Sequence, residues 1–527
     1  MSKTPLGRSP KGTACINCRQ RKIRCDGKRP VCSPCSSGLP SACRYSDGSL
    51  SPDQRLREEI AVLENRLEQL EHPNEPSKLS LHKTSSSTSA PRHTPLNISL
   101  NMRQALFRSF LPYSSEFGFC LDYSRFTASL SSSQQQPFPS ILSACQLLGA
   151  YLSPVNELSA LQSAFLSQAL HDVSHGLSRN PIKLAQSLIH CVQAEILLAQ
   201  YLFINGRTVE GKYRLSNAVS MVLGAGLHKI RSADIYAFQG RAGVHSLPPP
   251  VDPVDEGERL NALWQVVILN SCWTAADGSV SNIAYDVPES RIDAPWPLDA
   301  GTYSRTLLPD NLQGRYTVQN FLANVPDNGQ SLLALHAKSA ILFEKASLLR
   351  SQYNPHMALQ EATRFQQTFN NLNSVINRMA TSIPPLSGPN NSRSTIRILL
   401  VVHTLCRVAA IILHGTFEQS DPASHAQVLG SAESVVTLLK SVNLSDFPFI
   451  DPITGCLWTI TANVFIREIG SQNTSRMPKR VSLKELMNST EIIMSTMQIF
   501  ASRSSFIEES QLARVRQTYM ACINVKC

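Results

Sequence analysis

From about residue 101 onward, apolar residues recur at intervals of three and four, the spacing of one face of an α-helix. Alternation of apolar and polar residues, which is typical of strands, is scarce. The pattern therefore predicts an all-α fold, with a large α-helical body over residues 101–527. The clearest helical segments lie near residues 196–202, 215–223, 260–267, 332–350, 357–380, 393–415, 424–442, 453–469, 484–502 and 507–523.

Two clusters of Pro, Gly, Ser and Asn interrupt this pattern and predict surface loops. They are SLPPPVDPVDE at 246–256 and PPLSGPNNSR at 384–393. Between these loops, Trp264 and Trp273 follow the helical period, so we expect both indoles to pack in the core.

A different repeat precedes the body. Over residues 53–72, apolar side chains recur at alternating steps of four and three, the heptad seam of a coiled coil. Its members are Leu56, Ile60, Leu63, Leu67 and Leu70. Pro73 ends the predicted helix. The seam is short, so two interpretations stay open: a dimerising coiled coil at 51–72, or one amphipathic helix packed on its own domain.

Residues 73–100 show no hydrophobic periodicity and are rich in Ser, Thr and Pro, as in TSSSTSAPRHTP. This composition predicts a disordered linker. With a separate module expected at 1–50, the predicted order is module, coiled-coil segment, linker and helical body.

Hydrophobic residues make up 42% of the 527 residues and charged residues 17%, enough apolar matter for a sizeable core. The net charge of +10 is concentrated: residues 1–45 hold ten Lys or Arg and the single acid Asp26, or +9. A basic block on a nearly neutral chain indicates a polyanionic partner such as nucleic acid, the alternative being a solvated tail.

Six cysteines in this block are spaced C-x2-C-x6-C-x6-C-x2-C-x7-C; they are Cys15, Cys18, Cys25, Cys32, Cys35 and Cys43. Two C-x2-C pairs are typical of zinc sites. Six thiolates are too few for two separate tetrahedral sites, so either two sulfurs bridge or one ion has other ligands. The alternative is a disulfide-stapled module, which needs an oxidising compartment; the first residues, MSKTPLGRSPKG, do not form a signal peptide. So short a segment needs metal binding to fold. The binding free energy of structural zinc, on the order of 10–16 kcal/mol, would supply the folding free energy.

No membrane-spanning helix is expected, because the most apolar run, residues 396–413, carries Arg397, His403 and Arg407. The chain shows none of the motifs G-x-G-x-x-G, P-loop, H-E-x-x-H or G-x-S-x-G, so we do not expect an enzyme.

The segment CINCRQRKIRCDGKRPVCSPCSSGLPSAC resembles the fungal zinc binuclear cluster, the DNA-binding module of yeast galactose-regulator-type transcription factors. The resemblance rests on the six cysteines, the C-R-x-R-K-x-R-C run and Pro30, and it covers residues 15–43. It implies two zinc ions, with Cys15 and Cys32 bridging, Cys18 and Cys25 completing one site, and Cys35 and Cys43 the other.

Four of the six residues between Cys18 and Cys25 are basic, and on one short helix they would fan around most of its circumference. The resemblance assigns Lys22, with Arg21 beside it, to the edges of a CGG triplet in double-stranded DNA. A lysine or arginine can donate to guanine O6 and N7, which agrees. Phosphate contacts are expected from the remaining basic residues, Arg19, Arg24, Lys28 and Arg29.

The resemblance also favours dimerisation by the coiled coil, since such factors place one after the cluster. Residues 190–300 resemble, in GRTVEGKYRLSNAVSMVLGAGLHK and ERLNALWQVVILNSCW, the fungal-specific transcription factor domain (middle homology region). The chain departs from that pattern at Ala276-Asp277-Gly278, where an Asp-Arg pair and a Gly-Arg-Pro turn are usual.

The function expected is a nuclear, zinc-dependent regulator of RNA polymerase II genes that reads paired CGG triplets as a homodimer and contacts the transcription machinery. Two alternatives remain: a metabolite-binding or enzymatic body tethered by a zinc module, and a zinc-stabilised scaffold that never reads DNA. The basic helix argues against the scaffold, which has no need of that charge density.

Overall fold

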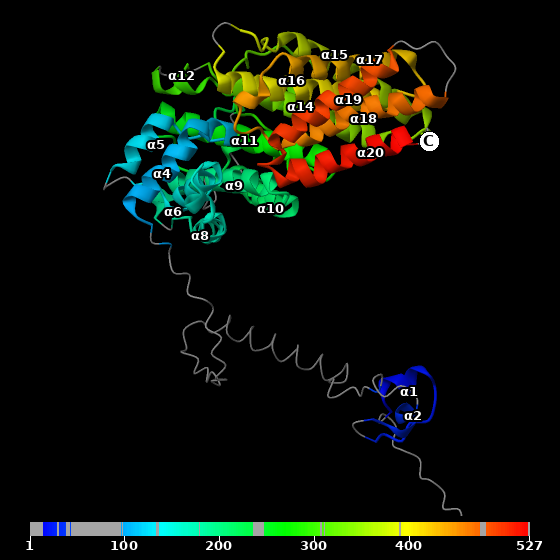
Figure 1. The fold of residues 1–527 in the computed structure, drawn as a ribbon. Coiled ribbons are helices and arrows are strands. Elements are labelled where there is room, and N and C mark those ends of the chain that lie inside the picture. The colour runs from blue at the N-terminus through cyan, green and yellow to red at the C-terminus, as the bar shows by residue number, and fades with distance from the viewer. Residues whose placement is uncertain are drawn as a thin grey trace, which may run out of the picture. The chain divides into compact units, whose positions relative to one another are not determined.

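The structure is a computed structural model that describes residues 14–28, 31–37, 43, 96, 98–132, 136–178, 180–234, 247–305, 308–309, 311–388, 391–474 and 481–524. The chain divides into two compact units, Met1–Arg92 and His93–Cys527 (Figure 1). The predicted coiled-coil residues Leu56, Ile60, Leu63, Leu67 and Leu70 lie outside the described residues, as does most of the predicted linker.

In the first unit, two short helices carry the two C-x2-C pairs. Helix α1 is Ile16–Gln20 and helix α2 is Ser33–Ser36, so each begins directly after the first cysteine of its pair. Pro34 lies in the first turn of α2, where its missing N–H removes no helical hydrogen bond.

The second unit is built of helices, and its described residues contain no strand, only the isolated bridge of Ser232 with Gly314. The all-α prediction is confirmed. The α-helices are α4 (Leu100–Phe110), α5 (Tyr123–Leu130), α6 (Pro139–Leu152), α7 (Asn156–Ser159), α8 (Gln162–Ser174), α9 (Pro181–Ile204), α10 (Thr208–Gly224), α11 (Pro253–Asp277), α12 (Ala300–Arg305), α13 (Thr317–Leu322), α14 (Leu332–Gln352), α15 (Leu359–Ser382), α16 (Arg393–His414), α17 (Pro422–Lys440), α18 (Ile453–Thr474), α19 (Leu483–Ala501) and α20 (Ala513–Asn524). Shorter 3-10 helices are η2 (Leu111–Phe117), η3 (Leu227–Lys229) and η4 (Leu444–Asp446), and η5 (Phe506–Leu512) is a π-helix.

Side-chain caps explain where several helices begin. The hydroxyl of Ser99 accepts from Met102 N and caps the start of α4. Leu96 and Ile98, just before this helix, pack against the core, so they belong to the body rather than to the predicted linker. In α11, Asp252 caps the helix and Pro253 occupies its first turn. The loop predicted at 246–256 therefore ends at Asp252, because a proline fits the first helical position.

Helices α11, α14 and α16 form the middle of the body, with α14 packed against both of the others. Helices α4 to α10 gather on the side of α11, and α17 to α20 on the side of α16 (Figure 1). Trp264 and Trp273 are 0% and 3% exposed, which confirms their prediction as core residues.

Two helices are long and apolar enough to meet a length and hydropathy test for membrane spans: Lys183–Ile204 in α9 and Arg393–His414 in α16. Other helices of the body surround both. In the most apolar stretch of each helix, 94% and 78% is buried, respectively. This is the environment of core helices.

Candidate metal centre and nucleic-acid interface

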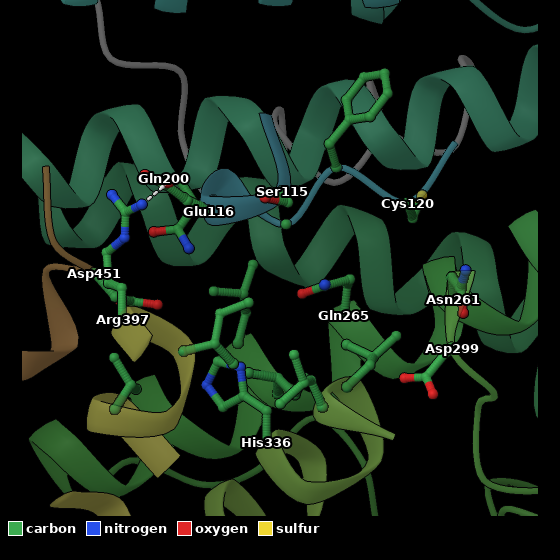
Figure 2. Close-up of a pocket in the computed structure, with 18 of the residues that line it drawn as sticks. Ser115, Glu116, Cys120, Gln200, Asn261, Gln265, Asp299, His336, Arg397 and Asp451 are labelled. Carbon is green, nitrogen blue, oxygen red and sulfur yellow. Dashed lines mark ion pairs between the residues drawn. The ribbon is translucent and has the colours of Figure 1, made fainter. Parts of the chain in front are cut away.

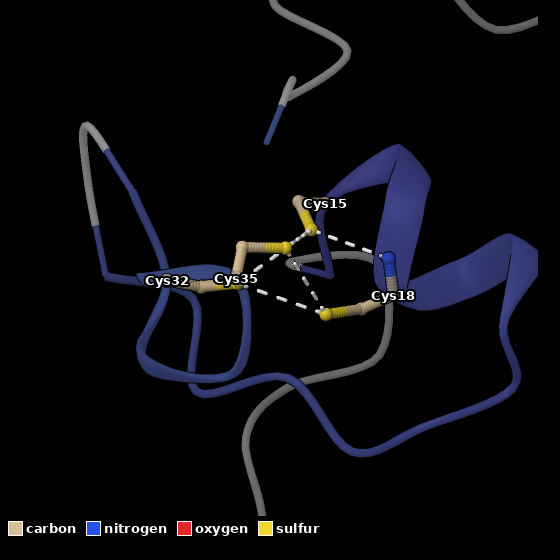
Figure 3. A group of neighbouring side chains, drawn as sticks. All are labelled: Cys15, Cys18, Cys32 and Cys35. Carbon is tan, nitrogen blue, oxygen red and sulfur yellow. Dashed lines mark hydrogen bonds between the residues drawn. The ribbon is translucent and has the colours of Figure 1, made fainter. Parts of the chain in front are cut away.

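Four cysteine sulfurs from the two helical turns converge on one point (Figure 3). Cys15 Sγ lies 3.7 Å from Cys32 Sγ and 3.8 Å from Cys35 Sγ. Cys18 Sγ lies 3.6 Å and 3.8 Å from the same two sulfurs. Since α1 and α2 each contribute one pair, the sulfurs join the two halves of the module.

The other two cysteines flank Cys32. Cys43 Sγ is 3.7 Å from Cys32 Sγ, and Cys25 groups with Cys32 and Asp26 within 4.8 Å. Cys15, Cys18 and Cys32 have no exposed surface, and Cys25 is 8% exposed. The six predicted ligands are therefore brought together.

The sulfur separations fit zinc. With a Zn–S bond of about 2.3 Å, the edge of a tetrahedral thiolate site is about 3.8 Å. The measured separations are 3.6 to 3.8 Å, whereas a disulfide joins its sulfurs at about 2.05 Å. Cys15, Cys18, Cys32 and Cys35 alone have the geometry for one ion, and six thiolates provide for two if two sulfurs bridge.

Nearby N–H groups stabilise negative charge on these sulfurs. Cys18 N donates to Cys15 Sγ at 3.4 Å, and Cys32 N donates to Cys43 Sγ at 3.3 Å. The Asn17 amide donates to Cys35 Sγ at 3.3 Å and lowers the pKa of the Cys35 thiol to about 7. Burial raises the pKa of Cys18 to about 12, so in the metal-free module this sulfur would hold its proton until zinc displaces it.

An acid ties the loop after Cys25 to the second helix. The Asp26 carboxylate accepts from Ser33 N at 3.1 Å and from Ser33 Oγ at 2.5 Å, and these bonds lower the pKa of Asp26. In the sequence Asp26 stands out only as the single acid of the basic block, and Ser33 and Asn17 do not stand out at all. No spacing signal marks them, because their partners are set by how the chain folds around the sulfurs.

The basic segment is only partly helical, which corrects the expectation that Arg19, Arg21, Lys22 and Arg24 fan around one helix. Helix α1 ends at Gln20, and Lys22 has the left-handed φ of 52°. Ile23 N donates to Cys18 O at 3.1 Å, a six-to-one bond that ends a helix in a Schellman-type turn. The chain must turn here to return Cys25 to the sulfurs.

This turn displays a basic surface. The residues Arg21, Lys22, Arg24 and Lys28 are all exposed. The side chain of Arg19 and all of Arg29 lie outside what the structure describes. Positive side chains on a short protruding turn suit contact with phosphates and groove edges.

Residues 13–51 match the family model of the fungal Zn(2)-Cys(6) binuclear cluster domain. Among curated proteins, the chain is 44% identical over 62 residues to transcription factor FBD3 of Gibberella moniliformis, covering 12% of this chain and 8% of that protein. It is 35% identical over 77 residues to the C6 finger domain transcription factor hasF of Aspergillus fumigatus, covering 12% and 10%. It is 50% identical over 40 residues to multidrug resistance regulator 1 of Candida albicans, covering 8% and 4%.

The similarity thus spans a tenth or less of each of these relatives. No solved structure matches the chain. The matched model, the six neighbouring sulfurs and the fold agree on one conclusion. The chain carries an N-terminal zinc cluster of the fungal Zn(2)-Cys(6) type, whose cofactor is two zinc ions, and a large all-α body.

Proposed function

We propose that this protein is a zinc-dependent, sequence-specific DNA-binding regulator of RNA polymerase II genes that acts in the nucleus, and that it is not an enzyme. The observation that carries the proposal is the cluster of six cysteines with an exposed basic turn between the second and third of them. The matched family model and the relatives named as transcription factors support it.

Within the cluster, we assign Cys15 and Cys32 as bridging ligands. Cys18 and Cys25 complete one site, and Cys35 and Cys43 the other. Contacts of Cys32 with sulfurs of both sets, Cys18 at 3.6 Å and Cys43 at 3.7 Å, support its bridging role. Cys15 is likewise 3.8 Å from Cys35. The Cys18 and Cys35 sulfurs, which the assignment gives to different ions, also lie 3.8 Å apart, so zinc content has to decide the partition.

For DNA reading, we assign Lys22 and Arg21 to the guanine edges of a CGG triplet and Arg19, Arg24, Lys28 and Arg29 to phosphates. Lys22 lies in the turn that ends α1, with a φ of 52°, and is exposed, as a residue that reads DNA must be. One module reads only about three base pairs, so specificity in a genome needs a second copy.

We therefore propose a homodimer joined through Leu56, Ile60, Leu63, Leu67 and Leu70. In this proposal, the body is the fungal-specific transcription factor domain, which regulates transcription through contacts with the transcription machinery. Helices α9 and α10 support that assignment: they form an antiparallel pair around the turn at Gly206, whose φ is 72°, in the segment that carries the resemblance.

The deciding experiment is selection of binding sites from random double-stranded DNA by the full-length protein, with and without a zinc chelator. We expect enrichment of paired CGG triplets, lost on chelation. The control is Cys145→Ser, which alters a buried cysteine of the body and should leave selection intact. Enrichment that survives chelation, or none at all, would refute the proposal.

A further inference from the structure

A cavity of about 230 Å³ lies between helices of the body. Its wall is formed by η2, α9, α11, α14 and α16, with the segment from Phe449 to Asp451 at one end. Figure 2 shows Glu116, Gln200 and Arg397 at that end, Asn261 toward the other, and Gln265 and His336 between them. The remaining wall is largely apolar, with Ile268, Leu269, Leu333 and Val401 among its members.

Several polar atoms in this wall are buried without a hydrogen-bond partner among the described residues. They are Glu116 Oε2, Gln200 Oε1, Asn261 Oδ1, His336 Nε2 and Arg397 Nε. Gln200 is 3% exposed, Asn261 9% and Arg397 5%. A buried polar group without a partner is costly, and native proteins keep few of them. Their gathering around one cavity indicates a partner that enters it.

The wall holds one basic side chain, Arg397, and three carboxyls, those of Glu116, Asp299 and Asp451. Arg397 forms an ion pair with Glu116 and donates from Nη1 to Phe449 O at 3.1 Å. Asp451 accepts from Ile453 N at 3.0 Å, and burial raises its pKa to about 6. Burial lowers the pKa of His336 to about 4, so this imidazole is neutral at pH 7. No cation is left over to pair with an anionic ligand, and Glu116 is already neutralised.

The polar atoms that lack partners are mostly acceptors. Glu116 Oε2, Gln200 Oε1 and Asn261 Oδ1 are oxygens that can only accept, and the neutral His336 can accept at Nε2. A complementary molecule must therefore donate hydrogen bonds at two ends and present apolar surface between them.

The size of the cavity limits the molecule. A dry cavity of about 150 Å³ holds benzene, so 230 Å³ suits on the order of ten non-hydrogen atoms. We propose that the helical body binds a small amphipathic molecule without negative charge in this cavity, one with hydroxyl or N–H donors at both ends of an apolar ring or short chain. The site does not depend on DNA binding.

The test uses full-length protein and three probes of similar size, measured by saturation-transfer NMR and thermal denaturation. 4-Hydroxybenzyl alcohol carries a hydroxyl at each end of one ring, 4-methylanisole has no donor, and 4-hydroxybenzoate is an anion. We expect the diol to bind with a Kd no weaker than about 10 mM, and the other two at least several-fold more weakly.

Two variants localise the binding. Val401→Phe places a ring in the cavity and should abolish binding of the diol while keeping or raising the melting temperature. Asn261→Leu removes a partnerless acceptor, so it should raise the melting temperature yet weaken binding by about tenfold. A residue with a purely structural role would not move stability and affinity in opposite directions.

Leu333→Phe, at a partly exposed lining position, replaces Val401→Phe if the latter does not fold. The proposal is overturned if no probe binds at about 10 mM, if the donor-free or anionic probe binds as well as the diol, or if the cavity-filling variant binds it unchanged.

Discussion

Cys32 stands at the junction of the sulfur cluster. Its Sγ lies within 3.7 Å of the sulfurs of Cys15, Cys18 and Cys43, and it groups with Cys25 as well. A thiolate in contact with sulfurs of both halves can bridge two metal ions, whereas the proposed assignment gives Cys43 to one ion only.

This difference gives a prediction on zinc content. If Cys32 bridges as proposed, Cys32→Ser removes a ligand from both ions and should leave well under one zinc per chain, while Cys43→Ser should leave about one. Elemental analysis of the purified full-length variants measures this, with Cys145→Ser as a control that keeps two. Equal losses in the Cys32 and Cys43 variants would contradict the bridging assignment.

In the proposed DNA contacts, Lys22 reads a guanine and Lys28 contacts a phosphate. Both are exposed lysines of the module. Lys22→Ala should reduce discrimination between CGG and random sites by about 1–3 kcal/mol, because a lost guanine contact affects only the cognate site. Lys28→Ala should weaken binding to both kinds of DNA alike.

Fluorescence anisotropy on specific and random duplexes checks this pair, with zinc content measured alongside. The backbone strain at Lys22 is the same for lysine and alanine, so we expect Lys22→Ala to keep the fold of the module. A variant that misfolds would be recognised by its lower zinc content. If Lys22→Ala weakened both duplexes equally, the lysine would be a phosphate contact instead.

At this scale the sequence predicted the cysteines well, because a C-x2-C step makes two ligands neighbours whatever the rest of the chain does. It could not reveal Asn17 or the Asp26–Ser33 link. These contacts join residues whose proximity is created by the cluster itself.

At the scale of the helices, the sequence located α14, α16, α17 and α19 to within a few residues, since polar caps and prolines mark their ends. Two differences have physical causes. Helix α11 begins seven residues before the predicted Leu260, at Pro253, because Asp252 caps it. The π-helix η5 replaces part of the last predicted helix. Its first residue, Phe506, packs against Trp273 with ring centroids 5.3 Å apart, and this tertiary contact cannot be predicted from the hydrophobic period.

Two helical glycines predict opposite effects for one substitution. A Cβ on Gly149 of α6 would lie 2.3 Å from Leu106 O of α4, so backbone must shift. Gly430 is exposed in the interior of α17 with nothing within 4 Å. Gly149→Ala should destabilise the body by about 1–3 kcal/mol through overpacking, and Gly430→Ala should stabilise it by about 0.5–1 kcal/mol through helix propensity.

Urea denaturation followed by circular dichroism compares these two variants with the wild type. The chemical change is the same in both variants. If the free energy of unfolding changed in the same direction in both, the close approach of α4 and α6 would not determine the effect of Gly149→Ala. The effect on Gly149→Ala also reports on packing next to η2, which lines the cavity.

Across the whole molecule, the basic excess lies in the N-terminal block, while buried carboxyls with raised pKa values lie in the helical body. The sequence shows only the first of these two features. The +9 of residues 1–45 is evident from composition and indicates the polyanionic partner. The carboxyls inside the body are not evident, because their burial follows from tertiary packing. Burial raises the pKa of Glu195 and Asp451 to about 6 and that of Glu258 to about 7.

Glu258 makes this division measurable. Its carboxyl accepts from Asp122 N at 2.9 Å, beside Arg125 and Asp255. The folded pKa is near 7 and the unfolded pKa near 4.5, so the folded state holds the proton more tightly between these values. The stability that this group contributes is complete below about pH 4.5 and is lost as pH rises through 7, by about 3 kcal/mol.

Glu258→Gln cannot titrate, so the unfolding free energy of the wild type relative to this variant should fall between pH 5 and about pH 8. Taking the difference cancels Glu195 and Asp451, which act in the same direction, and also His190, whose pKa is lowered to about 4 and which acts in the opposite one. Urea titrations across this pH range provide the measurement, and Glu433→Gln, at an exposed position on α17, is the matched control. A difference that stayed constant with pH, or rose, would mean that Glu258 is ionised in the folded body.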